Sequence, residues 1–587
     1  MRMNHKFNLR FALLALIAVG VACLPLMLIG PQTGDSLYTN LSWASQFTEE
    51  LFGGQWYPRW LSGLNAGAGS PVFFFYAPLP FYVSAAAALA CQQCSEVIRL
   101  GLTEALIVLA SAAAFLVFAR RVAGGRAAAV ASVVYALAPY HFAMDVLRRQ
   151  AIGEAAAYIG MPLALYFCDR LVRGDGSRSR MTLGLAVSYT LLMLSHLPAT
   201  LLFSPFLLGW GLFAARRQQR AAAVVHVGLA VTLGAALAAG YLLPALFEQG
   251  SITMSALYSA YYEYHRWFFF DGQDSPNEPL SRTLLLVFGC PTLALLGVWM
   301  LVRGRIDGGE RRALRASLFF LAGAWWLMTP LSQPVWLLLP LLQKVQFPWR
   351  AGIVIDMAAA IGVAVAFEHL LRMRGPQRML GLTAVIAPVA LSLAMSAWYF
   401  AGALRLKSDP AHQTMIRQWI ATGEDTDEYI PSGIDRKRPE LTAAIARRPA
   451  LQWNSGNGSV IASAWQGRRV LLDTQLDQPA EVTVRQFQFS GWRARVVGSG
   501  AELPVGRDHD GLIVLQVPAG LNAVELTLPL LPSERFGWAT SLCALLVCLM
   551  LWLRGRRQRI GRTRSAAVRD MADTATTTTA PQGLPPG

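Results

Sequence analysis

Long apolar blocks, separated by short polar segments, dominate the pattern of this 587-residue chain. Most blocks run for about 18 residues or more, which is enough for a helix to cross the roughly 30 Å hydrocarbon core of a bilayer. The blocks that we expect to cross are 11–30, 100–119, 126–144, 152–169, 181–197, 199–214, 221–245, 283–302, 316–330, 351–371, 379–400 and 537–553. The pattern therefore predicts a mainly α-helical, polytopic membrane bundle with about twelve spans.

Clusters of basic residues between the blocks indicate the orientation of the bundle, because cytoplasmic loops are enriched in Lys and Arg. The clusters are Arg2, Lys6 and Arg10; Arg120, Arg121 and Arg126; Arg170, Arg173, Arg178 and Arg180; Arg216, Arg217 and Arg220; Arg303 to Arg315; Arg372, Arg374 and Arg378; and Arg554 to Arg569. If every cluster is cytoplasmic, an even number of crossings separates neighbouring clusters. Both termini are then expected to be cytoplasmic.

One apolar stretch, 71–91, does not fit this count. It lies between the first two basic clusters, and two other crossings, 11–30 and 100–119, already lie between them. Its first half, "SPVFFFYAPLP", contains three prolines, and proline interrupts a straight helix. We therefore expect residues 31–98 to form a large loop at the outer face that lies on the membrane or dips into it. The alternative is that 71–91 crosses and that one basic cluster violates the rule.

Residues 401–536 differ from the rest of the chain, because apolar and polar residues alternate there in short runs such as "EVTVRQFQF", "GLIVLQV" and "AVELTL". A period of two with intervening turn residues is typical of strands that bury one face. After the membrane module 1–400, we expect an extracytoplasmic domain that resembles a β-sandwich. A last span, 537–553, and a basic, disordered cytoplasmic tail, 554–587, are expected to follow.

Composition agrees with a membrane protein, since 54% of the residues are hydrophobic and 15% are charged, against about 25% charged in soluble chains. The net charge of +16 does not indicate a nucleic-acid partner, because the basic residues lie between apolar blocks as the positive-inside rule describes. No small-residue cleavage site follows the first apolar run, so we expect a retained span. Cys91 and Cys94 either form a disulfide in an oxidising compartment or remain two thiols.

Ionisable and aromatic residues at the predicted outer face are the candidate functional residues, because charges near the membrane are costly and tend to mark function. The candidate base is Asp35, and the candidate substrate-binding residues are Arg59, Trp60, Arg148, Arg149, Glu154, His196 and Arg350. Arginines suit an anionic lipid phosphate, and a carboxylate suits a general base. Plainer interpretations remain open, namely a helix cap for Asp35, a helix-end role for His196, and interfacial anchors for the arginines and tryptophans.

Several motifs resemble those of bacterial membrane proteins labelled "6-pyruvoyl-tetrahydropterin synthase-related". They are "GDSLYTNLSWASQF", "WYPRWLSGLNAGAGSPVFFFYAPLPFYVSA", "APYHFAMDVLRRQAIGEAAAYIGMPLAL", "SHLPATLL" and "VQFPWRAGI", within residues 30–370. The order of features is also similar to the type C glycosyltransferases (GT-C), which have an acid after the first span, a large first outer loop and often a late outer domain. The label does not imply pterin chemistry, because the chain has no clustered histidines to hold zinc.

The GT-C resemblance implies an inverting glycosyltransferase of the bacterial inner membrane, with Asp35 at the catalytic position. Such an enzyme transfers a sugar from a polyprenyl-phosphate donor to an extracytoplasmic glycan, lipid or protein. Ser36 follows Asp35 where many GT-C enzymes have a second acid, which argues against a divalent metal, and no cofactor is assigned. Two alternatives remain open. One is a transporter or lipid-linked glycan handling protein without catalysis; the other is an inactive GT-C-like scaffold that binds glycan through aromatics such as Trp465 and Trp492.

Overall fold

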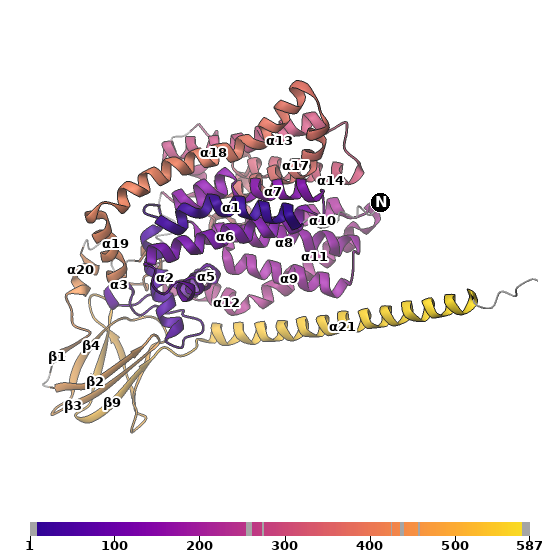
Figure 1. The fold of residues 1–587 in the computed structure, drawn as a ribbon. Coiled ribbons are helices and arrows are strands. Elements are labelled where there is room, and N and C mark those ends of the chain that lie inside the picture. The colour runs from indigo at the N-terminus through magenta and orange to yellow at the C-terminus, as the bar shows by residue number, and fades with distance from the viewer. Residues whose placement is uncertain are drawn as a thin grey trace, which may run out of the picture.

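The computed structural model describes residues 9–253, 261–272, 275–423, 425–434, 440–455 and 458–577. Its larger part is a bundle of long helices, and a smaller β-domain lies at one end of that bundle (Figure 1). The helices of the bundle are α1 (Leu9–Ile29), α6 (Glu96–Ala119), α7 (Gly125–Ala136), η1 (Pro139–Arg149), α8 (Ile152–Arg173), α9 (Arg178–Ser195), α10 (Leu197–Ala214), α11 (Arg220–Leu237), α12 (Ala239–Phe247), α13 (Glu278–Val302), α14 (Gly308–Leu327), α17 (Gly352–Arg372), α18 (Gly375–Lys407) and α21 (Pro532–Thr577). The predicted fold class, a helical bundle with a late β-rich domain, is confirmed.

Within the described residues, ten helical segments are long and apolar enough to cross a membrane. A bent pair, Gly308–Leu327 with Pro330–Leu338, adds an eleventh if its two helices, which meet at 89°, count as one span. The sequence predicted about twelve, and the remaining helix is α9. It begins with Arg178 and Arg180 and carries several hydroxyl side chains. This helix is therefore less apolar than its neighbours, although it packs along α8 and α11.

Residues 30–95, between α1 and α6, contain four short helices. We call this range of residues the outer segment. The four helices are α2 (Leu37–Phe52), α3 (Leu64–Gly67), α4 (Val72–Phe75) and α5 (Leu79–Ala90). Helix α5 has 12 residues, about 18 Å at 1.5 Å per residue, which is too short for a core of roughly 30 Å. None of these four helices qualifies as a span. Cys91 and Cys94, at the end of the segment, form a disulfide.

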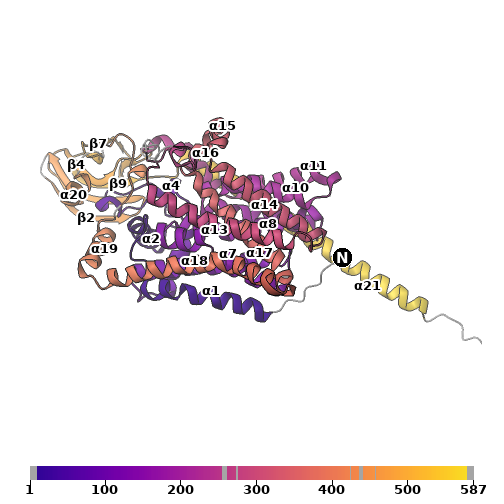
Figure 2. The ribbon, with the colours of Figure 1, turned by 90° about the horizontal axis from the view of Figure 1, so that it is seen from above.

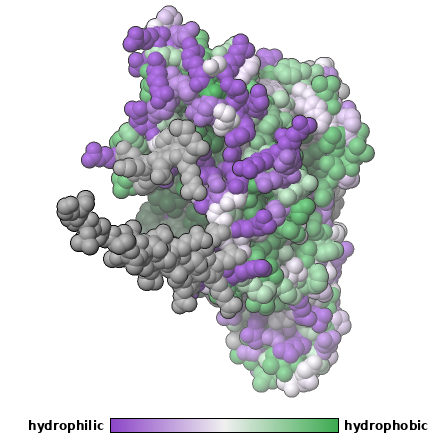
Figure 3. Space-filling model, turned by 90° about the vertical axis from the view of Figure 1, so that its right-hand side faces the viewer, coloured by the Kyte–Doolittle hydropathy of each residue, from purple (hydrophilic) through white to green (hydrophobic). Residues whose placement is uncertain are grey.

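The two ends of the bundle differ in charge. The connections farthest from the β-domain carry the arginine clusters, where Arg121 pairs with Asp169 and Arg126 with Glu368 at 2.9 Å each. Figure 3 shows hydrophilic side chains over much of this end. The start of α1 and the far end of α21 point the same way (Figures 1 and 2). This asymmetry is the one that the positive-inside rule describes.

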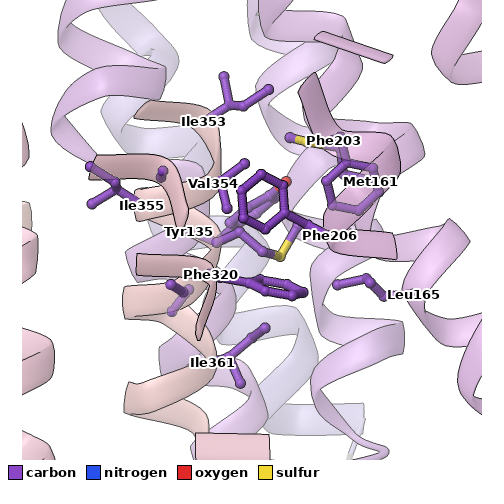
Figure 4. Close-up of a cluster of buried hydrophobic side chains, with 14 of the residues drawn as sticks. Tyr135, Met161, Leu165, Phe203, Phe206, Phe320, Ile353, Val354, Ile355 and Ile361 are labelled. Atoms are coloured by element: carbon purple, nitrogen blue, oxygen red, sulfur yellow. The ribbon is translucent and has the colours of Figure 1, made fainter. Parts of the chain in front are cut away.

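Helix α17 is the buried centre of the bundle, with every residue from 352 to 366 buried. Figure 4 shows isoleucine and valine side chains of α17 packed among residues of α7, α8, α10 and α14. At its start, Gly352 lies so close to Phe288 that a Cβ would come within 2.1 Å of the ring. This close packing fixes the position of the preceding turn, which contains Arg350.

The β-domain consists of two antiparallel sheets, with strand orders β1-β4-β8-β7 and β2-β3-β9-β5-β6. The strands are β1 (Leu451–Ser455), β2 (Gly458–Gln466), β3 (Arg469–Leu476), β4 (Ala480–Phe487), β5 (Arg493–Val496), β6 (Glu502–Leu503), β7 (Val505–Arg507), β8 (Leu512–Val517) and β9 (Gly520–Thr527). Their alternate apolar residues form a shared core. Trp492 lies in this core and Trp465 packs against it, so these two residues do not form an exposed glycan platform.

The C-terminal segment differs from the expected disorder. Helix α21 continues without a break from Pro532 to Thr577, so residues 554–577 are helical. Many residues after 554 are Arg, Gln, Ala or Met, which favour helix, and the preceding apolar helix removes the cost of nucleation. Residues 578–587 lie outside the described residues.

Candidate functional site

Asp35 lies in the turn between α1 and α2, and its carboxylate forms an ion pair with Arg148. Both side chains are about half exposed, at 48% and 47%. Backbone hydrogen bonds hold the two segments together, from Asp35 N to the Arg148 carbonyl at 3.3 Å and from Ser36 N to the Arg149 carbonyl at 3.1 Å. Ser36 is the N-cap residue of α2. The carboxylate of Asp35 therefore faces Arg148 at the surface and does not cap the helix.

The partner of this turn is η1, an 11-residue π-helix, and π-helical turns are rare and often occur at functional sites. The next residue, Gln150, has a positive φ of 59°, and its carbonyl accepts a hydrogen bond from Asn40 Nδ2 at 2.6 Å. Gly34 lies so close that a Cβ would come within 2.2 Å of Gln150 Cγ. Only glycine fits at position 34, and this close contact fixes the neighbouring Asp35 beside the end of η1.

Behind the ion pair, Arg149 lies in a buried polar cluster. Its Nη1 contacts Asp145, and lies 3.1 Å from Glu154 Oε2 and 3.2 Å from the Tyr140 hydroxyl oxygen. The Tyr140 hydroxyl donates to Glu154 Oε1 at 2.7 Å. The Arg149 guanidinium carbon also lies 4.5 Å from the centre of the Trp349 ring. Two carboxylates thus compensate the buried charge of Arg149, which is how a buried ion is stabilised.

Arg350 approaches the same carboxylate from the start of α17. Its Nε lies 3.4 Å from Glu154 Oε2, and its Nη1 donates to the Val345 carbonyl at 2.7 Å. The side chain is 14% exposed. Because Arg149 and Arg350 share Glu154, the charge of Arg350 is less fully compensated than that of Arg149.

His196 and Tyr76 lie next to the Glu154 end of the cluster. His196 caps α10, with its Nδ1 accepting from Ala199 N at 3.2 Å. A Cβ at Gly153, next to Glu154, would lie 3.5 Å from His196 Cδ2 and 3.4 Å from the Tyr76 hydroxyl oxygen. Burial raises the pKa of Tyr76 to about 12, so this hydroxyl remains neutral.

Asp356, an acidic residue that is not among the predicted site residues, lies deeper in the bundle. Its Oδ2 accepts from the backbone N of His141 and from the Tyr158 hydroxyl, both at 3.0 Å. The His141 ring stacks on Tyr158 with ring centres 3.7 Å apart. A carboxylate within the apolar block 351–371 was the signal that could have found it. Asp145 lies in one of the motifs quoted from the sequence, and its role as partner of Arg149 depends on the π-helical turn of η1, in which the two residues are four positions apart.

Two predicted site residues, Arg59 and Trp60, lie elsewhere. Arg59 is buried against the start of α21, where its Nε lies 2.9 Å from Glu534 Oε1. Trp60 Nε1 donates to Gln486 Oε1 of the β-domain at 2.7 Å. These residues join the outer segment to α21 and the β-domain, and the structure does not bring them to the Asp35 site. Asp35, Arg148, Arg149, Glu154, His196 and Arg350 do gather where η1 ends and α8, α10 and α17 begin.

Potential metal ligands do not cluster at Asp35. Among the described residues, the only group of three or more His, Cys, Asp or Glu side chains close enough to share an ion is Asp508, His509 and Asp510, between β7 and β8. Arg448 forms ion pairs with Asp508 and Asp510, so both carboxylates of this group already have a cationic partner. The Asp35 site instead combines one accessible carboxylate with arginines. This combination can accept a proton and hold an anionic group.

Several solved membrane-protein structures are similar to the chain. The Archaeoglobus fulgidus oligosaccharyltransferase is 13% identical, with 70% of this chain and 59% of that chain covered and a TM-score of 0.44. The arabinofuranosyltransferase AftD from Mycobacteria is 17% identical, with 67% and 27% covered and a TM-score of 0.42. ArnT from Cupriavidus metallidurans, bound to undecaprenyl phosphate, is 16% identical, with 71% and 74% covered and a TM-score of 0.37. The chain therefore spans little more than half of the archaeal enzyme and about a quarter of AftD.

No curated protein matches the sequence. A family model described as "6-pyruvoyl-tetrahydropterin synthase related domain; membrane protein" matches residues 73–401. This range covers more than half of the 587 residues, and it contains η1, α17 and most of the residues around Arg149. The chain belongs to this family of 6-pyruvoyl-tetrahydropterin synthase related membrane proteins.

Proposed function

We propose that this protein is a GT-C-type glycosyltransferase that transfers a sugar from a polyprenyl-phosphate donor to an extracytoplasmic acceptor. The observation that carries the proposal is the half-exposed ion pair of Asp35 and Arg148. Arg148 is next in the chain to the buried Arg149, whose partner Glu154 also contacts Arg350. An exposed pair of this kind costs little to open. Asp35 is therefore available to a substrate, whereas the carboxylates behind it are occupied by arginine.

In the proposed reaction, a carboxylate oxygen of Asp35 accepts the proton of an acceptor hydroxyl. The hydroxyl oxygen then attacks the anomeric carbon of the donor sugar from the face opposite the phosphate. The bond between that carbon and the phosphate oxygen breaks, so the configuration inverts and polyprenyl phosphate leaves with the bonding electron pair. Positioned proton transfer of this kind contributes roughly 10²–10⁴-fold to a rate.

The three arginines differ in how well they can bind the phosphate of the donor. Arg149 is compensated by Asp145 and Glu154, so a further anion gains little from it. Arg148 is half exposed, and Arg350 shares its carboxylate. We therefore assign phosphate binding to Arg148 and Arg350, and we assign to Arg149 the positioning of the end of η1. His196 and Glu154 line the same cluster and support Arg350.

The charge asymmetry of the bundle supports an orientation in which the arginine-rich end and both termini are cytoplasmic. Asp35, the outer segment and the β-domain then face the extracytoplasmic side of a bacterial inner membrane. The donor reaches the site from the bilayer, and the acceptor reaches it from outside.

The test is transfer of labelled sugar from a polyprenyl-phosphate donor in membranes containing wild-type protein or Asp35→Asn. Asparagine keeps the shape but cannot act as the base, so we expect a loss of about 10²–10⁴-fold. Asp307→Asn is the matched control, because Asp307 caps α14 at the opposite end and asparagine caps equally well. Full transfer by Asp35→Asn contradicts the mechanism.

A second candidate function is the movement of a lipid-linked glycan without chemistry. It is favoured by an ionisable group inside the bundle, since Glu104 on α6 is buried. Ionisable groups at such depth often mark a transport pathway. Glycolipid movement in liposomes without donor turnover, unchanged in Asp35→Asn, supports this candidate over the enzyme.

A further inference from the structure

The outer face of the five-stranded sheet carries a row of charged side chains that the proposed reaction does not use. Glu525 on β9 lies between two arginines, with Arg469 Nη2 on β3 at 2.7 Å from Oε1 and Arg495 Nη2 on β5 at 2.6 Å from Oε2. The Glu525 side chain is 8% exposed, but those of Arg469 and Arg495 are 50% and 60% exposed. The carboxylate therefore orients both guanidinium groups while leaving much of each open to solvent.

This row lines a groove of about 660 Å³ between the sheet and the outer segment, closed on one side by Gly53, Gly54 and Gln55. We call it the arginine groove. Arg468, also in its wall, is fully engaged, because it binds both oxygens of Glu534 and donates to the carbonyls of Leu528 and Pro529.

Arg493 gives the arginine groove a cation that is not compensated. It lies two residues before Arg495 on β5, so both side chains are on the same face of the sheet. Arg493 is exposed, and within the described ranges it has no ion pair. Glu502, opposite Arg495 on β6, is the second acid of the lining besides Glu525. Arg469, Arg493 and Arg495 thus exceed these two acids by one positive charge.

The lining also indicates which ligand fits. No aromatic side chain is among the residues that line the groove in the described part of the chain. Trp465 and Trp492 belong to the core side of the domain. Sugar stacking on a ring is therefore not available, whereas guanidinium groups bind carboxylate and phosphate in a bidentate manner.

We propose that the arginine groove binds a glycan that carries carboxylate or phosphate groups. Arg493 and Arg495 contact its anionic groups, and the turn of Gly53 to Gln55 contacts its sugar rings. This binding is independent of catalysis at Asp35. Only the identification of the bound glycan as the acceptor rests on the proposed glycosyl transfer.

The test measures binding of three fluorescent probes to the full chain in detergent. The probes are a hexamer of galacturonic acid, a short oligomer of glycerol phosphate, and neutral maltohexaose. We expect saturable binding of at least one acidic probe, weakened about tenfold by Arg493→Gln and by Arg495→Gln and lost at about 1 M salt. The two acidic probes distinguish carboxylate from phosphate recognition.

Arg507→Gln is the matched control, since Arg507 is an exposed arginine on β7 of the other sheet. We expect it to leave binding unchanged, and we expect the same of Asp35→Asn. Substitution of Arg493 breaks no ion pair in the described structure, so its effect reports on binding and not on folding. Equal binding of maltohexaose, no binding of either acidic probe, or equal loss in Arg507→Gln overturns the proposal. Loss of transfer in Asp35→Asn with glycan binding retained shows that the two sites act separately.

Discussion

Two contacts between an acid and arginine, both made by the outer segment, lie in opposite environments. Asp35 and Arg148 are about half exposed and form a single ion pair. Glu534, by contrast, is fully buried between Arg59 and Arg468 at 2.9 Å and 2.8 Å, and Arg59 also lies 4.0 Å from the Tyr57 ring centre. The first contact can open at small cost, whereas removal of one partner from the second leaves buried charge unpaired.

Charge and position in the sequence therefore do not by themselves identify a functional residue. Arg59 and Arg148 were both predicted for the outer face, and both pair with an acid. Accessibility separates them, because solvent reaches Arg148 but not Arg59. Single substitutions that remove a charge or a hydrogen-bond donor test this difference, and we order them by the expected effect on stability.

Glu534→Gln should have the largest effect. It keeps the shape of the side chain but leaves Arg59 and Arg468 buried with one carboxylate fewer, which costs about 3–5 kcal/mol. The measurement is the free energy of unfolding of the purified protein in detergent. Glu96→Gln is the control, because Glu96 is 41% exposed and 3.7 Å from Arg99. Equal stability of the two variants contradicts a structural role for the buried contact.

Glu154→Gln should follow, with a loss of about 2–3 kcal/mol for charged hydrogen bonds in a buried site. The change leaves Asp145 as the remaining carboxylate beside Arg149 and removes the partner of Arg350. Unfolding of the purified variant is compared with that of Glu368→Gln, whose partner Arg126 is 53% exposed. A Glu154 variant as stable as this control would show that the cluster does not fix the end of η1.

Trp60→Phe should cost about 1 kcal/mol, because the aromatic packing stays while the Gln486 oxygen loses its donor. Trp60 is fully buried, and Trp56 is 65% exposed, so Trp56→Phe is the matched control. Thermal unfolding of both variants measures the difference. If Trp56→Phe is the more destabilised, Trp60 does not join the outer segment to the β-domain.

Asp35→Asn should have the smallest effect on stability, at most about 0.5 kcal/mol, because an exposed ion pair contributes little and salt screens it. The free energy of unfolding is measured at low and high salt. A loss comparable to that of Glu534→Gln would place Asp35 among the structural residues and remove the contrast between the two contacts.

Much of the fold could be predicted because it depends on local patterns. Apolar length predicted the spans, three prolines predicted that 71–91 does not cross as a straight helix, and alternation predicted strands such as β8 and β9. The exposure of single residues could not be predicted in this way. Trp492 lies on the core side of the β-domain, which depends on how two sheets pack, and the pattern of one strand does not specify that.

The candidate site was predictable only in part for the same reason. Charges at helix ends indicated Asp35, Arg148, Arg149, Glu154, His196 and Arg350, but did not indicate which of them pair. The pairing of Arg149 with Asp145 depends on the π-helical turn of η1. The burial of Arg59 depends on α21, almost 500 residues later in the chain. Contacts between distant segments therefore decide which charged residues are exposed and which are buried.

The most direct test of the central claim, that Asp35 is the accessible base, is the rate of sugar transfer by Asp35→Asn at saturating polyprenyl-phosphate donor. The rate is measured in preparations whose thermal midpoints match those of the wild-type protein. The account predicts a rate lower by about 10²–10⁴-fold with the fold intact. A wild-type rate in this variant would contradict it.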